Sequence, residues 1–311
     1  MGVISEPVFT GPFQTPEAEE DFQLERHGVW KRFRRHKLAL VGAAVIILIG
    51  LTAVLAPLLH LQDPNAIDNV NWNGPPLAPG AFGHILGTDE VGRDLLARLI
   101  YGAQVSLKVA IFAVLMELTI GTILGAVAGY YGKWIDYVLM RVTDVFLSIP
   151  LLPLLLVLTA IVAATSNKAA LSEWVIVFII GGLSWPPVAR LVRASFLSLR
   201  EKEFCEAARA IGSRDGRIIF RHLLPNAVAP IIVQGTLEVA NVILLESTLS
   251  FLGFGIQPPT ASWGNMLANA QSNITVAPWA AIFPGLCILI TVLAINYLGD
   301  GLRDALDPNM K

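Results

Sequence analysis

The chain carries a charged, helix-prone stretch, Glu206-Ala207-Ala208-Arg209-Ala210-Ile211-Gly212, which is followed by His222-Leu223-Leu224-Pro225-Asn226. It lies within residues 190–221, which hold eight basic side chains and no long apolar run. The rest of the sequence is mostly apolar. We interpret this stretch as a handle, by which a protein outside the membrane could grip and move helices inside it.

Composition places the chain in a membrane. Of its 311 residues, 54% are hydrophobic and 15% are charged, which is far more apolar than a soluble domain of that length. Several runs reach the roughly 20 apolar residues that one membrane-spanning helix needs. We therefore predict an all-α, polytopic membrane protein. The formal net charge of −2 excludes a nucleic-acid binder of the usual basic type.

Positively charged side chains predict the orientation. A basic cluster at residues 31–37 precedes the first apolar run and should lie in the cytoplasm, whereas the outer loops hold only Arg93, Arg98 and Lys168. Residues 1–37 form an acidic tail without the features of a signal peptide. Both termini are expected in the cytoplasm. Six spans are expected at about 38–59, 105–130, 137–164, 174–188, 228–251 and 279–298 of the domain 38–311. The predicted outer loops are 62–102 and 252–278, and the handle occupies the inner loop 190–226.

Local patterns predict two short helices in the handle. Residues 195–211 read as one helix, in which small Ala207 and Ala208 let a partner approach the backbone. Gly212 can end that helix with a positive φ, and Ser213 can cap a second helix that ends before Pro225. A helix lying on the lipid surface is the alternative that the residues themselves leave open.

Four motifs resemble one family. Glu-Ala-Ala at 206–208, Gly212 and the run His222–Asn226 resemble the signature of ABC-importer permeases. Leu86-Gly87-Thr88-Asp89-Glu90-Val91-Gly92-Arg93-Asp94, the run Leu249–Gly255 and the run Gly299–Pro308 are similar to the C-type permease of the dipeptide, oligopeptide and nickel branch. The resemblance covers about residues 30–308.

The resemblance implies partners for this chain. It implies a homologous second permease, two ATPase subunits that bind ATP and Mg²⁺, and an extracytoplasmic substrate-binding protein, in a bacterial or archaeal cytoplasmic membrane. The coupling residues would be Glu206, Ala207, Ala208, Arg209, Gly212, His222, Pro225 and Asn226. ATP-driven closure of the ATPases would then pull the coupling helices together and open the membrane cavity outward. Di- or oligopeptides are the expected cargo, with nickel or another small solute as the alternative.

Motifs for chemistry within the chain itself are missing. The sequence contains no Gly-x4-Gly-Lys-Ser/Thr motif for ATP and no His-Glu-x-x-His motif for zinc. Cys205 and Cys287 lie in different environments, and His84 and His222 fall on opposite sides of the membrane. We therefore expect no catalytic residues, no metal site and no cofactor in this chain. An autonomous secondary transporter remains a less favoured alternative, because it has no use for a charged inner helix pair.

Ionisable groups within predicted spans are candidates for function, because they are costly in lipid. Glu117, Glu238 and Glu246 are such groups, and Glu238 shares a helix face with Asn241. One hypothesis places Glu238, Asn241 and Glu246 on the translocation path, where Glu238 offers a carboxylate to a cationic cargo group. The alternative is a carboxylate paired with a neighbouring helix.

Two further patterns leave open whether they serve function or structure. Asp89, Gly92, Arg93 and Asp94 could form an outer gate or dock the binding protein, or could simply order their own loop. Residues 121, 125 and 129 are glycines at small-xxx-small spacing, which lets a helix approach closely. That helix could belong to this chain or to another subunit.

Overall fold

The computed structural model describes residues 30–165 and 172–306, so most of the predicted acidic tail, the loop around residue 168 and the last five residues lie outside the described part. Within it the chain is helical, with no β-strand. The helices are α2 (Lys37–Val54), α3 (Leu95–Tyr131), α4 (Lys133–Ser148), α5 (Leu151–Thr165), α6 (Glu173–Leu183), α7 (Pro186–Leu199), α8 (Glu203–Ala210), α9 (Asp215–Ile218), α10 (Leu224–Phe251), α11 (Trp263–Ala270) and α12 (Trp279–Leu306).

The predicted all-α membrane fold is confirmed. In the described residues, four helical stretches are long and apolar enough to cross a membrane, and the number rises to six if two bent pairs each count as one span. The pair α4 and α5 bends by 82°, and the pair α6 and α7 bends by 44°. The bends fall at Pro150 and at Pro186-Pro187, because proline cannot donate the backbone hydrogen bond of a regular helix.

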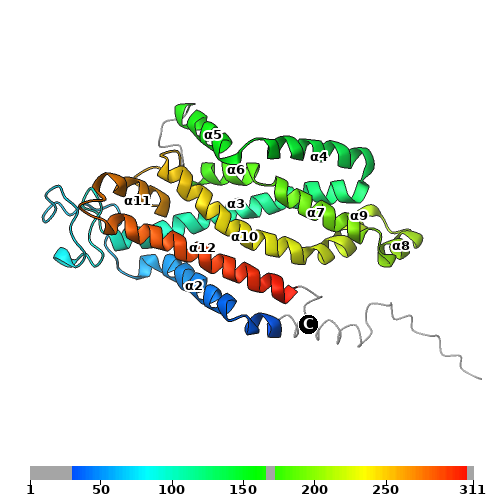
Figure 1. Ribbon diagram of the computed structural model, residues 1–311, viewed down its shortest axis with the longest axis horizontal. Helices are drawn as coiled ribbons and strands as arrows, with labels where there is room; N and C mark the ends of the chain where they lie inside the picture. Colours follow the sequence, from blue (N-terminus) through cyan, green and yellow to red (C-terminus); the bar gives the residue numbers. More distant parts are fainter. Residues whose placement is uncertain (1–29, 166–171, 307–311) are drawn as a thin grey trace, which may run out of the picture.

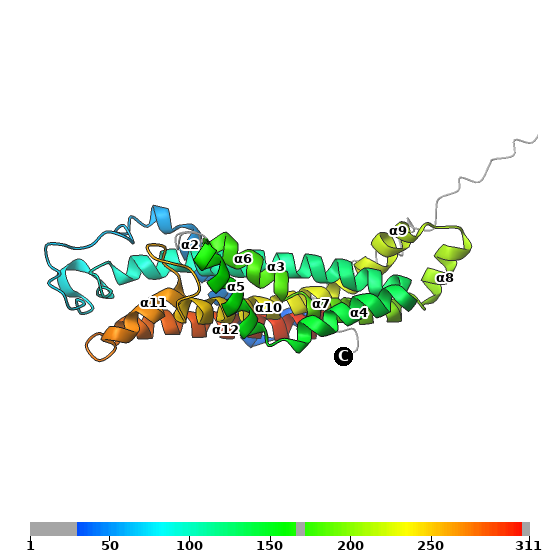
Figure 2. The ribbon, with the colours of Figure 1, turned by 90° about the horizontal axis from the view of Figure 1, so that it is seen from above.

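The helices form an elongated bundle. Figure 1 shows α2 running beside α12, with α3 and α10 passing through the length of the molecule. The polar segment at residues 62–94, which we call the polar loop, lies with α11 at one end. Figure 2 shows α8 and α9 at the opposite end. The predicted handle and the predicted outer loop are thus at the two ends of one bundle.

The glycines of α3 pack against α7 of the same chain. A Cβ atom on Gly125 would lie 2.4 Å from the carbonyl oxygen of Ala189, and one on Gly129 would lie 2.6 Å from Cβ of Phe196. Both distances are below any ordinary contact, so only glycine allows α3 and α7 this close. Of the two interpretations of this spacing, the intramolecular one is confirmed.

Several helix ends differ from the prediction. Helix α3 begins at Leu95, ten residues before the expected start, because Asp94 accepts a hydrogen bond from the backbone N–H of Ala97 at 2.8 Å and caps the helix within polar sequence. Helix α2 ends at Val54 rather than near residue 59, just before a short 3₁₀ turn that contains Pro57. The last helix continues past its apolar run to Leu306.

Candidate functional site

Helix α8 is the core of the predicted handle. Its first turn carries Glu203 and Glu206 and its last turn carries Arg209, so the charges complement the helix dipole. Cys205 and Ala208 are buried against α3, α7 and the helix that follows. Ala207, on the other side, is exposed. Helix α8 therefore presents Glu206 and Ala207 outward, whereas Ala208, predicted to face a partner, packs inside the chain.

The prediction of one helix over residues 195–211 is wrong. Helix α7 ends at Leu199, and Lys202 is extended with ψ 149° before α8 begins. Arg200 explains the break, because its Nη1 atom donates to the carbonyl oxygens of Gly129 at 3.2 Å and Tyr130 at 3.5 Å. Its side chain thus covers the carboxyl end of α3 while the backbone turns toward α8.

Gly212 ends α8 as predicted. Its φ is +79°, its N–H donates to the carbonyl of Arg209 at 2.9 Å, and the N–H of Ser213 donates to Ala208 at 3.0 Å. These two bonds form the left-handed helix end that favours glycine. The turn leaves the side chain of Ile211 84% exposed at the tip of α8. A large apolar side chain so exposed at a loop tip marks a surface that a partner could cover.

The second predicted helix does not end before Pro225, and Ser213 is not its cap. Arg214 is the N-cap residue of α9, and the helix continues through a π-helical turn at Ile219–Leu223 into α10. Because Pro225 has no N–H to donate to the preceding turn, the widened π turn before it lets the helix continue. This segment holds His222, whose ring lies 6.5 Å from that of Phe204 on α8. Asn226 donates to the carbonyl of His222 at 2.7 Å.

Tyr130 joins α3 to the handle. Its hydroxyl donates to Oδ1 of Asp215 at 2.7 Å, and the guanidinium of Arg209 lies 6.0 Å from its ring centre. The side chain of Tyr130 is almost fully buried beside Cys205 and Ala208. Sequence reasoning missed this residue. The signal available was an aromatic pair at the end of a long apolar helix, which alone does not indicate a partner 85 residues away.

Some of the basic side chains within residues 190–221 are paired with α4. Asp144 on α4 lies 3.8 Å from Arg141 on the same helix and 2.5 Å from Arg190. Arg193 binds Asp136 through two hydrogen bonds. Both Arg190 and Arg193 lie in α7, not in a loop. The charged surface left for a partner is therefore narrower than the sequence indicated and centres on α8 and α9.

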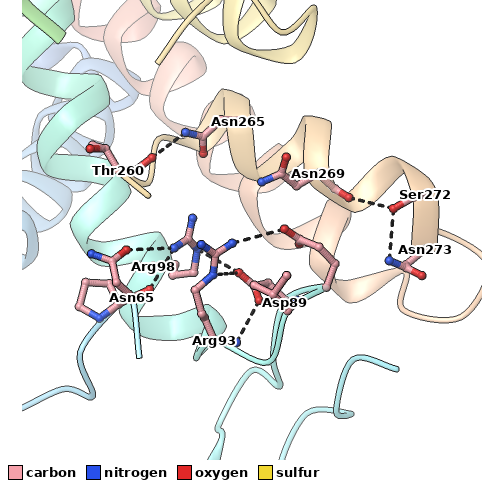
Figure 3. Close-up of polar contacts among 12 residues, drawn as sticks. Asn65, Asp89, Arg93, Arg98, Thr260, Asn265, Asn269, Ser272 and Asn273 are labelled. Atoms are coloured by element: carbon pink, nitrogen blue, oxygen red, sulfur yellow. Dashed lines mark hydrogen bonds and ion pairs between the residues drawn. The ribbon is translucent and has the colours of Figure 1, made fainter. Parts of the chain in front are cut away.

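Asp89 holds the polar loop together at the other end (Figure 3). Its Oδ2 atom lies 2.7 Å from Nε of Arg93 and 3.2 Å from Nε of Arg98, and its Oδ1 atom accepts the backbone N–H of Arg93 at 2.9 Å. The side chain of Arg98 is 1% exposed and also donates to the carbonyl of Pro64 at 3.0 Å. Burial and the neighbouring Asp89 charge raise the pKa of Glu90, which completes the cluster. These contacts order the loop.

Asp94 and Gly92 also have structural roles. Asp94 caps α3 and lies 2.9 Å from Nδ1 of His84, whose Nε2 lies 3.3 Å from Asp68. Hydrogen bonds, those from Asn71 first, lower the pKa of Asp68 to about 2. Gly92 has φ +83°, and a Cβ atom there would lie 2.6 Å from the ring of Trp72. These contacts account for the order of the polar loop.

The candidate path residues separate into two groups. Glu238 is half-buried and accepts hydrogen bonds from Gln234 at 2.6 Å and from Asn241 at 3.1 Å. Together Glu238 and Asn241 line a cavity. Glu246 is fully buried elsewhere, where it accepts hydrogen bonds from Ser250 at 2.8 Å and Ser106 at 3.3 Å.

Glu246 therefore has a structural environment. Ser106 belongs to α3 and also accepts the backbone N–H of Trp263, the first residue of α11, at 3.3 Å. The carboxylate thus ties α10 to α3 and α11. The structure does not bring it to the cavity that Glu238 and Asn241 line. Because Glu246 lies on the same helix as Glu238, the sequence suggested that both would face one site. The helical twist instead gives the two side chains different surroundings.

Fold and site together define a helical membrane protein with an exposed helix pair, α8 and α9, at one end and an ordered polar loop at the other. A chain of the methionine ABC transporter MetNI, solved in inward-facing conformations, has a TM-score of 0.55 and 19% identity over 68% of this chain and 98% of its own. The family model described as the binding-protein-dependent transport system inner membrane component matches residues 121–311. The N-terminal transmembrane domain of oligopeptide transport permease C matches residues 26–76.

Curated relatives match almost the whole chain. The dipeptide transport system permease protein DppC of Alkalihalophilus pseudofirmus is 41% identical over 99% of this chain and 98% of its own length. The glutathione transport system permease protein GsiD of Escherichia coli is 42% identical over 92% of this chain and 91% of its own. The chain belongs to the family of binding-protein-dependent transport system inner membrane components, as a C-type ABC-importer permease.

Proposed function

We propose that this chain forms, with a homologous second permease, the membrane path of an ATP-driven importer of dipeptides or short oligopeptides. The observation that carries the proposal is the 41% identity with a dipeptide permease along 99% of the chain. Relatives named for other peptides, such as glutathione, support the class of cargo rather than one member of it. Nickel as cargo has no comparable support.

Two separate ATPase subunits would drive the chain through α8. Glu206, Ala207 and Ile211 are exposed at the tip, and Gly212 fixes the shape of the turn. Small Ala207 beside a large apolar Ile211 suits a cleft that closes around the helix. An indirect role would fall to His222, Pro225 and Asn226, because they shape the segment that joins this surface to α10. ATP and Mg²⁺ would be bound by the ATPases.

The polar loop would face the substrate-binding protein outside the cell. Asp89, Arg93 and Asp94 would keep this surface rigid, and Gly92 would allow its tight contact with Trp72. Both chain termini would lie in the cytoplasm of a bacterium or an archaeon, because the basic cluster at residues 31–37 precedes α2 and six spans would return the chain to the same side. Glu238 and Asn241 would line the translocation path.

Reconstitution tests the proposal. The complete importer in proteoliposomes should take up a dipeptide only with its binding protein outside and ATP at the ATPase side. Omitting the ATPase pair should abolish uptake, whatever ion gradient is applied. Uptake by this chain alone under an ion gradient would instead support a secondary transporter and end the ABC interpretation.

A further inference from the structure

Two broken helices and α10 line an open cavity of about 540 Å³. Pro150 lines it from the break between α4 and α5, Ser184 from the break between α6 and α7, and Glu238 and Asn241 from α10. Small-molecule sites usually span roughly 300–1,000 Å³. Transporters commonly place cargo and ion sites where discontinuous helices meet, because freed backbone groups are available there. The cavity has both features.

The polar side chains in this cavity can accept further hydrogen bonds. The two oxygens of Glu238 are held by one amide donor each, from Gln234 and Asn241, so each oxygen keeps a free lone pair. Ser184 is only 8% exposed, and its hydroxyl has no hydrogen-bond partner within the described residues. The carboxylate is thus fixed in position and still available to a ligand.

The backbone around the break adds acceptors rather than donors. Helix α7 begins with Pro186 and Pro187, which have no N–H. The carbonyls of Gly182 and Leu183, four residues earlier, therefore lack their usual helical donors. Such a site favours a positively charged ligand that is rich in donors.

A second acidic side chain, Glu117, lies behind the cavity wall. It is 0% exposed, and neither of its oxygens has a hydrogen-bond partner in the part of the chain that the structure describes. Its neighbour Leu118 touches α10 at Gly235, and one turn further on Gly121 touches α7 near Trp185. Glu117 therefore lies between α10 and the α6–α7 break, where burial without a hydrogen-bond partner favours its neutral acid over its charged form.

A carboxylate without a cation beside it inside a membrane bundle is costly and usually functional. Peptide import would supply a cation for Glu238, so a cargo site here rests on the proposed function. We propose that the cavity binds the protonated amino group of the cargo, with Glu238 as the direct ligand. An ammonium group has three N–H donors and no acceptor, which complements the site. No group of three His, Cys, Asp or Glu side chains suited to a metal occurs among the described residues.

The test measures peptide binding in this cavity without the binding protein. The complete importer is placed in lipid nanodiscs, where both membrane faces are accessible, with Cys205 and Cys287 replaced by Ala. Leu244→Cys puts a thiol on the cavity lining for a cationic methanethiosulfonate reagent. Protection from labelling is titrated with a free dipeptide and with its N-acetylated form. The free dipeptide should bind about tenfold more tightly than the N-acetylated form, because acetylation removes the charged amino group and its hydrogen bond to the carboxylate.

Matched variants separate charge from structure. Glu238→Gln should bring the two affinities close together, whereas Glu201→Gln, on an exposed side chain, should preserve the difference. Glu117→Gln should also preserve it, because an amide replaces a buried side chain that is already neutral. Equal affinity for both peptides in the parent, or an unchanged ratio in Glu238→Gln, would overturn the proposal. ATP-driven uptake by the same parent complex shows separately whether peptide import itself stands.

Discussion

Tyr130, at the carboxyl end of α3, donates a hydrogen bond of 2.7 Å to Asp215, at the start of α9. Helix α3 is continuous from Leu95 to Tyr131, and its first turn carries the Asp94 cap and Arg98. One unbroken helix therefore contacts both the handle and the polar loop. A movement of α8 and α9 would reach the opposite end of the bundle through this helix.

Tyr130→Phe should weaken this connection. The ring and its packing remain, but the hydrogen bond to a carboxylate is lost, which costs about 1.5–3 kcal/mol. We expect less peptide imported per ATP hydrolysed, with the basal ATPase rate kept. Both rates are measured in proteoliposomes, with Tyr131→Phe, on a side chain that is 46% exposed, as the control. An unchanged ratio would show that the bond plays no part in transmission.

Gly125→Ala should destabilise the α3–α7 contact. The added methyl group would lie 2.4 Å from the backbone oxygen of Ala189, which cannot move without the helix. Overpacking of this kind typically costs about 1–3 kcal/mol. Thermal unfolding of the purified complex should show a lower melting temperature. Gly285→Ala is the control, because a Cβ atom there meets no described atom within 4 Å and its melting temperature should not fall.

Asp89→Asn should disorder the polar loop. It leaves Arg93 and the buried Arg98 without their shared carboxylate, and breaking a buried ion pair costs about 3–5 kcal/mol. Hydrogen exchange should become faster across residues 62–94. Glu90→Gln should have a small effect, because the contact of Glu90 with Arg93, at 3.3 Å, is longer than that of Asp89, at 2.7 Å. Slow exchange in Asp89→Asn would contradict this account of loop order.

Cys205 should react slowly with maleimides while α8 is docked. The thiol is fully buried, and burial raises its pKa above the ordinary 9.0, so little thiolate forms at neutral pH. The pKa of the Cys205 thiol is higher when α8 is docked than when the thiol is exposed. The docked state therefore loses stability as the pH rises from 9 through the pKa of the docked thiol. Labelling should therefore speed up above pH 9. Mass spectrometry measures the rate, and rapid labelling at pH 7 would mean that α8 is not packed as described.

The fold was predictable from composition, because long apolar runs and basic flanks have few alternatives in a membrane. The handle was predictable as a location and as a glycine-terminated helix, since Gly212 has one backbone role there. The detailed structure of the handle was not predictable. The break at Arg200 and the π turn before Pro225 depend on side chains meeting α3 and on a continuing helix, neither of which a local pattern contains.

Long-range contacts explain the remaining differences. Glu246 and Glu238 looked alike in the sequence, yet one is held by serines from two helices and the other lines a cavity. The bond of Tyr130 to Asp215 joins residues with no shared local pattern. Asp94 was a candidate for an outer gate, for docking or for ordering its own loop, and its cap of α3 appears only once the start of that helix is known.

The central claim is that ATPase subunits grip the exposed tip of α8, and Ile211→Asp tests it most directly. Val70→Asp is the matched control, because Val70 is 86% exposed and Ile211 84% exposed, at opposite ends of the molecule. The measurement is the amount of ATPase that copurifies with the permease pair. The account predicts that Ile211→Asp loses most of the ATPase while Val70→Asp retains it. Full retention of ATPase by Ile211→Asp would contradict the claim.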